Sequence, residues 1–402
     1  MKVVSALISS LLTFWWMLAP AQAAEATKAK VGAKTGIKAK AGAKTTAKTK
    51  AKAPPKAKPK TPGAPTAAAL PHRAELTDER SLAAEVTAAR QTLAADPRDG
   101  EARERLARAA VALIDLLLGA EAVGDTEKAE RLVQMLRKDL HDTGWRVQKM
   151  SQKGDLKASQ ATGFLLAHGI FLPKDANKAC GEFVAAAEQL PSAGWHAAQC
   201  LMEALPEKAW ENMESAAQRG HAAALEWMGR RCLGEFGARG KDFACARIHL
   251  SASASQGRPR AQTLLAYLLA SGQGGEVDQS RAIRLYKLAA EHGDADAQNN
   301  LGEIYEMGRG TDRNLDEALR WSEGAAQRGL GSAQFNAGRL WAIGVGERKD
   351  PERARALLVQ AEGNGVPQAR QVLDWLDRQA PSASTAASDK APAAAGNTTK
   401  KD

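Results

Sequence analysis

A repeat of 36 residues constrains the fold of this chain more than any other feature of its sequence. An Ala-Gln pair begins at Ala261, Ala297 and Ala333, and Ala369 continues the series at the same spacing. Small, apolar and glycine residues recur at fixed offsets inside each period. A period in this range indicates stacked supersecondary units, none of which buries its apolar face alone.

The unit that begins at Ala297 shows what each repeat must be. Leu301 and Tyr305 stand four residues apart, as on one face of a helix, and Gly308 is the residue type that ends a helix with positive φ. A second helix is expected from about Leu315 to the glycine at position 329. Small residues on both helices favour a close approach, so the sequence predicts an all-α, α/α solenoid of helix hairpins.

The residue pattern of the repeat closely resembles the Sel-one-like repeat, a relative of the tetratricopeptide repeat. The matching positions of one unit are Ala297, Leu301, Gly302, Tyr305, Gly308, Gly310, Ala318, Trp321, Ala325, Ala326 and Gly329. Carrying the register outward gives six units and a closing helix over residues 158–379. Residues 73–150 are expected to be helical and resemble a degenerate tetratricopeptide hairpin more weakly.

Residues 1–23 have the pattern of a secretory signal. A basic start and a short apolar run are followed by Ala21-Gln22-Ala23, which favours cleavage after Ala23. The exported chain would then be periplasmic or secreted. The alternative is an uncleaved anchor in the inner membrane, although the run is short for a membrane span.

Residues 24–70 form a Lys/Ala/Pro-rich tract, and residues 380–402 form an Ala/Ser/Thr-rich tail; both are predicted to be disordered. The tract holds twelve lysines and one acidic residue, so it accounts for the net charge of +10 of the whole chain. One interpretation is a solvated spacer. The other is an arm that seeks an anionic glycan or lipid surface. We do not expect nucleic acid as the partner if the chain is exported.

Four cysteines, Cys180, Cys200, Cys232 and Cys245, form an even set in a chain predicted to enter an oxidising compartment. Hairpin geometry favours a Cys232–Cys245 disulfide within one unit, which leaves Cys180 to pair with Cys200. The alternative is four small buried thiols.

No catalytic motif accompanies the repeats. The sequence has no H-E-x-x-H, C-x-x-C, G-x-S-x-G or Walker-type signature, and the histidines are scattered. We therefore expect no enzyme, cofactor or metal. A hydrolase with an unrecognised site is the least favoured of three hypotheses, after a scaffold and a polyanion binder.

The family resemblance implies a scaffold or adaptor that binds a protein, a peptide or an envelope polymer on the concave face of the solenoid, in some cases within an envelope assembly complex. In the related tetratricopeptide hairpin the first helix lines that face. The positions two and six residues after each unit start are the expected contacts, namely Glu226, Arg230, Thr263, Tyr267, Asn299, Glu303, Phe335 and Arg339. The alternative is a merely solvated face.

Overall fold

A computed structural model describes residues 78–237, 240–345 and 348–379. In these ranges the chain is helical, and its extended structure is limited to one isolated bridge between Val345 and Arg348. The helices are α2 (Asp78–Ala95), α3 (Gly100–Val123), α4 (Thr126–Asp139), α5 (Gly144–Gln152), α6 (Leu156–His168), α7 (Ala176–Ala187), α8 (Pro191–Leu201), α9 (Pro206–Gln218), α10 (Ala222–Cys232), α11 (Phe243–Ser255), α12 (Pro259–Ser271), α13 (Gln279–Glu291), α14 (Ala295–Met307), α15 (Leu315–Gln327), α16 (Gly331–Ile343), α17 (Pro351–Gly363) and α18 (Gln368–Gln379).

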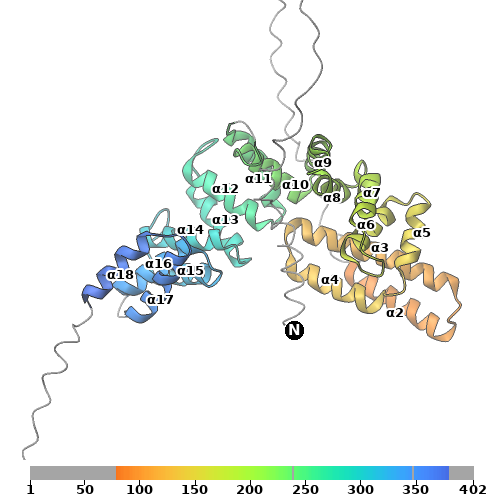
Figure 1. The fold of residues 1–402 in the computed structure, drawn as a ribbon, viewed down its shortest axis with the longest axis horizontal. Coiled ribbons are helices and arrows are strands. Elements are labelled where there is room, and N and C mark those ends of the chain that lie inside the picture. Colours follow the sequence, from red (N-terminus) through yellow and green to blue (C-terminus); the bar gives the residue numbers. More distant parts are fainter. Residues whose placement is uncertain (1–77, 238–239, 346–347, 380–402) are drawn as a thin grey trace, which may run out of the picture. The chain divides into compact units, whose positions relative to one another are not determined.

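From α6 onward the helices form hairpins, and each helix packs against the one before and the one after it (Figure 1). The hairpins are α6–α7, α8–α9, α10–α11, α12–α13, α14–α15 and α16–α17, and α18 closes the series. We call α6, α8, α10, α12, α14 and α16 the first helices. The α/α solenoid predicted from the repeat is confirmed.

In each of the last four hairpins, a polar residue caps the N-terminus of the second helix, which is α11, α13, α15 or α17. Asp242, Asp278, Asn314 and Asp350 are each 36 residues apart, and each side chain accepts a hydrogen bond from a backbone N–H in the first turn. This contact satisfies one of the N–H groups that a helix start leaves without an intrahelical partner. The repeat therefore encodes helix starts as well as packing positions.

Glycine allows the two helices of a hairpin to approach closely. A Cβ atom at Gly302 on α14 would lie 2.5 Å from Oγ of Ser322 and 3.2 Å from the carbonyl oxygen of Ala318, both on α15. Gly338 meets Leu358 in the same way one repeat later. Only a residue without a side chain fits at these crossings.

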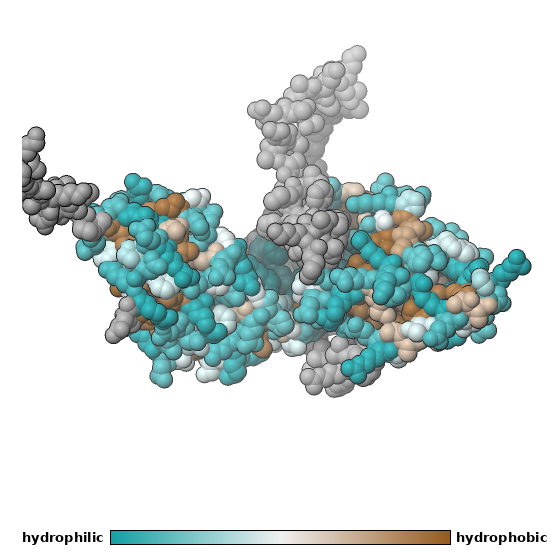
Figure 2. Space-filling model, turned by 90° about the horizontal axis from the view of Figure 1, so that it is seen from below, coloured by the Kyte–Doolittle hydropathy of each residue, from teal (hydrophilic) through white to brown (hydrophobic). Residues whose placement is uncertain are grey.

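The apolar core is divided along the chain rather than gathered at one centre. Separate clusters of buried residues lie within 82–197, 195–225, 246–304 and 318–376. On the face drawn in Figure 2, hydrophobic side chains form small patches among hydrophilic ones. Such a stack gains stability from contacts between neighbouring repeats.

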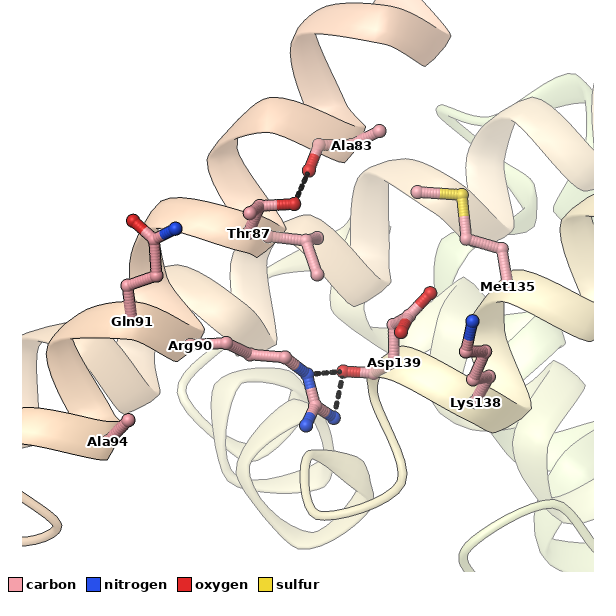
Figure 3. A pocket seen from close by; sticks show the side chains of 9 residues that line it. Ala83, Thr87, Arg90, Gln91, Ala94, Met135, Lys138 and Asp139 are labelled. Carbon is pink, nitrogen blue, oxygen red and sulfur yellow. Dashed lines mark hydrogen bonds between the residues drawn. The ribbon is translucent and has the colours of Figure 1, made fainter.

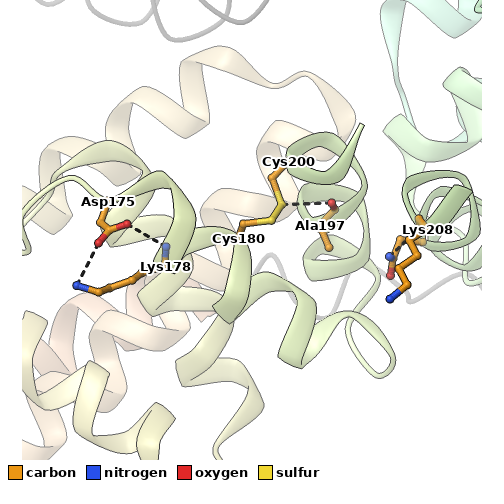
Figure 4. The surroundings of a disulfide bond; sticks show 7 residues. Asp175, Lys178, Cys180, Ala197, Cys200 and Lys208 are labelled. Carbon is orange, nitrogen blue, oxygen red and sulfur yellow. Dashed lines mark hydrogen bonds and ion pairs between the residues drawn. A yellow bond between two sulfur atoms is a disulfide. The ribbon is translucent and has the colours of Figure 1, made fainter. Parts of the chain in front are cut away.

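Two disulfides join elements of the stack. Cys180 on α7 pairs with Cys200 on α8 and links two hairpins (Figure 4), whereas Cys232 and Cys245 close the hairpin of α10 and α11. The Cα atoms of each pair are 5.9 Å apart. These are the two pairs that the sequence favours.

The predicted signal segment and lysine-rich tract, together with the C-terminal tail, lie outside the described residues. None of the described helices combines the length and the apolar character that a membrane span requires.

Candidate partner-binding surface

The first helices of the later repeats lie side by side and are joined by polar contacts. Arg258 at the start of α12 pairs with Glu226 on α10, and Arg260 on α12 pairs with Asp296 on α14. Nδ2 of Asn336 on α16 donates to Oδ1 of Asn299 on α14 at 3.0 Å. These contacts make one continuous surface from helices that are 36 residues apart in the chain.

Three of the four residues predicted two positions after a unit start lie inside this surface. Glu226, Thr263 and Asn299 are buried, with exposed fractions of 2%, 4% and 8%. Glu226 pairs with Arg258 and Arg230, Thr263 donates to the carbonyl of Pro259, and Asn299 donates to Glu303. Glu226 and Asn299 thereby join neighbouring first helices, whereas the hydrogen bond of Thr263 stays within α12. All three offer little surface to a partner because they are buried. Phe335, the fourth, is half-buried.

The residues six positions after a unit start differ in exposure and in the number of contacts that their side chains make within the stack. Tyr267 is 53% exposed, and its hydroxyl has no hydrogen bond to another described residue. Arg339 forms two contacts with the carboxylate of Glu306, at 2.6 and 2.7 Å. Arg230 pairs with Glu235 and stacks over Phe236, and Glu303 accepts from Asn336 at 3.3 Å. Tyr267 is therefore the most accessible of the eight predicted residues.

Two exposed apolar residues extend the same helix face by one turn and were missed in the sequence. Met307 lies four residues after Glu303 and is 55% exposed, and Ile343 lies four residues after Arg339 and is 54% exposed. The missed signal is the position ten residues after the unit starts at Ala297 and Ala333, where a large apolar side chain stands at a helix end, whereas the preceding unit has Ser271 there. We define Tyr267, Met307, Phe335 and Ile343 on α12, α14 and α16 as the open face.

The long helix α3 covers the first helices of the earlier repeats. It contacts α6, α8 and α10, and its buried residues include Leu106, Leu113, Ile114 and Leu117. Asp115 of α3 accepts from Lys157 at 2.9 Å and from Gln160 of α6 at 3.2 Å. The chain thus already binds one of its own helices on this side of the stack.

The end of α3 reaches the start of α12. Nη1 of Arg258 donates to the carbonyl oxygen of Ala122 at 2.9 Å, where the last turn of α3 has carbonyls without intrahelical partners. A Cβ atom at Gly124 would lie 3.5 Å from the ring of Pro259. The covered part of the surface therefore ends at α12, and the open face begins there.

A cavity of about 550 Å³ lies apart from this surface, between α2 and α4 (Figure 3). It is lined by Val86 and Met135 together with Arg90 and Lys138. Nε of Arg90 donates to the backbone carbonyl of Asp139 at 2.6 Å, so this guanidinium holds the two helices together. A second cavity, of about 360 Å³, is lined in part by Ser151 and Glu182, which share a hydrogen bond of 2.6 Å.

Buried histidines support the stack as neutral groups. Burial, the largest cause, acts together with the charges of His196 and Arg258 to lower the pKa of His221 to about 3. Nδ1 of His221 accepts from the backbone N–H of Ala224 at 3.3 Å and so caps α10. Burial also lowers the pKa of His168, to about 4. An imidazole that caps a helix must keep this nitrogen unprotonated.

The arrangement of stacked helix hairpins places the molecule among α-solenoid repeat proteins. The sequence profile of the Sel1 repeat matches residues 158–181, 202–221, 259–294, 295–330 and 331–366. The chain is therefore a Sel1 repeat protein, as the resemblance implied. This family generally mediates protein–protein interaction.

Solved structures similar to the chain include the following two proteins. One is a protective antigen present in uropathogenic Escherichia coli strains and displaying an SLR fold; it is 21% identical, covers 77% of this chain and 67% of its own, and has a TM-score of 0.57. The other is a Sel1 repeat protein from Oxalobacter formigenes, with 24% identity, coverage of 75% and 88%, and a TM-score of 0.48. None of the curated proteins matches the sequence.

Proposed function

We propose that the chain is an exported scaffold that binds a helical segment of a partner protein on the open face. The observation that carries this proposal is the packing of α3 across α6, α8 and α10. The first helices α12, α14 and α16 continue the stack, and within the described residues α18 packs against α16 but no helix runs across all three as α3 runs across α6, α8 and α10. A partner helix would take the place there that α3 takes on the earlier repeats.

The chemistry of the open face fits an amphipathic helix. Tyr267, Met307 and Ile343 offer more than half of their surface, and the half-buried Phe335 lies one helix turn before Arg339. Helix-in-groove binding uses apolar anchors at helical spacing, and aromatic residues often dominate the binding energy. Methionine adapts its shape to an apolar partner because its side chain is unbranched.

Polar groups border these anchors and are held in place by contacts inside the stack. The carboxylate of Glu306 is paired with Arg339, and Glu303 accepts from Asn299 and Asn336. Groups fixed before binding lose little side-chain entropy when a partner docks. We expect them to orient the partner helix, whereas the apolar anchors supply most of the affinity.

Site-specific photo-cross-linking tests the proposal in cells that produce the full chain. A photoreactive residue replaces Tyr267 or Ile343 on the open face. Matched positions are Leu288 on α13 and Val359 on α17, which are 46% and 54% exposed but belong to second helices. We expect one discrete partner to be cross-linked from the open face, through a segment with helical apolar spacing.

The matched positions give the decisive contrast. The proposal predicts that Leu288 and Val359 yield no cross-link to that partner. It also predicts that Tyr267→Ala together with Met307→Ala removes the cross-link formed from position 343. Equal cross-linking from first and second helices would overturn the assignment of the open face.

A second candidate function rests on the charge of the lysine-rich tract. In this alternative, the tract is an arm that binds an anionic glycan or lipid surface. Binding would be electrostatic, so it should weaken steeply with salt. Deleting residues 28–60 should abolish binding to anionic vesicles or glycans and leave the melting temperature unchanged. Retained binding by the deletion variant would exclude the tract as the binding element.

Export is part of the proposal and is supported by the two disulfides, which persist in oxidising compartments. The mature chain should begin at Ala24. The intact mass of the protein recovered from the envelope fraction checks this, since retention of residues 1–23 would indicate an anchored form.

A further inference from the structure

Beyond partner binding, we propose that reduction of the Cys232–Cys245 disulfide creates a site for Zn²⁺ or a similar thiophilic divalent cation, with His249 as the third protein ligand. Cys232 ends α10, and Cys245 and His249 stand four residues apart on α11. One ligand atom from each of the three residues lies within 4.8 Å of the other two. All three residues are half-buried.

The spacing of the ligands fits a tetrahedral cation. Residues four apart on a helix present their side chains on one face, so α11 supplies a thiolate and an imidazole to the same point. Two thiolates bound to one Zn²⁺ lie about 3.8 Å apart, given Zn–S bonds of ~2.3 Å. The Cα atoms of Cys232 and Cys245 are 5.9 Å apart, so side-chain rotation after reduction can reach that separation. Three protein ligands leave a fourth position for water.

His249 is prepared to act as a ligand. Its Nδ1 atom is buried and has no hydrogen-bond partner among the described residues. Burial lowers the pKa of His249, and the nearby carboxylate of Glu214 partly opposes that shift. Metals bind the neutral imidazole, which is the form that burial favours.

The site and the disulfide exclude each other. A dithiol reductant transfers two electrons and two protons to the disulfide, which opens to two thiols while the dithiol closes to its own disulfide. Binding of Zn²⁺ then releases two protons as the thiols become thiolates. The bound metal would in turn slow reoxidation, because both sulfurs are occupied.

The chain offers a matched control in its other disulfide. Cys180 and Cys200 have the same Cα separation, yet they belong to no cluster of three ligands among the described residues. The Sγ atom of Cys200 contacts the carbonyl of Ala197 (Figure 4). Reduction of this pair should therefore create two thiols without a metal site.

Cobalt titration of the reduced full-length chain tests the proposal. A phosphine reduces both disulfides under anaerobic conditions, and Co²⁺ reports thiolate ligation by absorption in the near ultraviolet. We expect one Co²⁺ per reduced chain, displaced by Zn²⁺, and none in the oxidised chain. His249→Ala should weaken binding at least about tenfold, since even outer-shell partners of a metal contribute that much.

Controls separate the site from general thiol chemistry and from loss of folding. Cys180→Ser/Cys200→Ser and His292→Ala should bind Co²⁺ as the wild type does. The oxidised His249→Ala chain should melt within a few degrees of the wild type, and Zn²⁺ should raise the melting temperature of the reduced wild type but not of reduced His249→Ala. Absence of thiolate absorption in the reduced wild type, or equal affinity in His249→Ala, would overturn the proposal.

Discussion

Arg258 and Ala122 are 136 residues apart in the chain, and Nη1 of the arginine donates to the carbonyl oxygen of the alanine at 2.9 Å. The same guanidinium pairs with the buried carboxylate of Glu226. One side chain therefore ties the end of α3 to both α10 and α12. This contact marks where the chain's own helix stops covering the first helices.

Replacing Arg258 with alanine should destabilise the protein by about 2 kcal/mol, because it removes hydrogen bonds to a charged group and leaves Glu226 with Arg230 as its remaining cation. Chemical denaturation measures the change. Hydrogen exchange should also become faster at the end of α3. Arg260→Ala is the matched control: its pair with Asp296 is about half exposed, so its loss should cost less than ~1 kcal/mol. Equal effects of the two variants would contradict the role given to Arg258.

Much of the fold is predictable from the repeat, because the apolar and small residues that recur at fixed offsets are the ones that pack in the core. Ala297, Leu301 and Ala318 are 0% exposed, since all three lie in the apolar core of the stacked hairpins. The open face is harder to predict. Glu226 and Asn299 are engaged by side chains of the neighbouring first helix, a contact that no single repeat contains. Likewise, the seat of α3 depends on pairs more than forty residues apart, such as Asp115 with Lys157.

Gly302→Ala should destabilise the protein by about 1–3 kcal/mol, because the new methyl group would overlap Ser322 and approach the backbone of α15. Thermal unfolding measures it. Gly181→Ala on α7 is the matched change, since a Cβ atom there meets nothing within 4 Å. That variant should instead gain about 0.5–1 kcal/mol from the higher helix propensity of alanine. A neutral Gly302→Ala would show that the hairpin does not close at this crossing.

Stability should fall as the pH is lowered from 6.5 toward 3–4. His221 and His168 have pKa values of about 3 and about 4 in the folded chain and the ordinary value of 6.5 when unfolded. The unfolded chain therefore binds more protons in this window, which favours unfolding. The contribution is fully present above pH 6.5. Between pH 5 and 6.5, where most carboxylates stay ionised, His221→Gln should flatten the dependence and the exposed His292→Gln should not.

Loss of the Cys232–Cys245 disulfide should destabilise the hairpin of α10 and α11 by about 3 kcal/mol, because a 13-residue separation closes a short loop in the unfolded chain. Denaturation of Cys232→Ser/Cys245→Ser measures the effect without added metal. Peptide mapping under non-reducing conditions checks the pairing itself. A Cys200–Cys232 linkage would contradict both the pairing and the boundaries of the repeats.

The central claim is that the open face binds a partner helix as α6, α8 and α10 hold α3. The most direct measurement is the affinity of the purified chain for a synthetic peptide of the segment that position 267 cross-links. Tyr267→Ala, Met307→Ala and Ile343→Ala combined should weaken binding by at least about 2 kcal/mol, or roughly thirtyfold, with circular dichroism of the free protein unchanged. The peptide should gain helicity on binding the wild type, and Leu288→Ala with Val359→Ala should bind as the wild type does. Undiminished affinity in the triple variant, or an equal loss in the second-helix variant, would contradict the account.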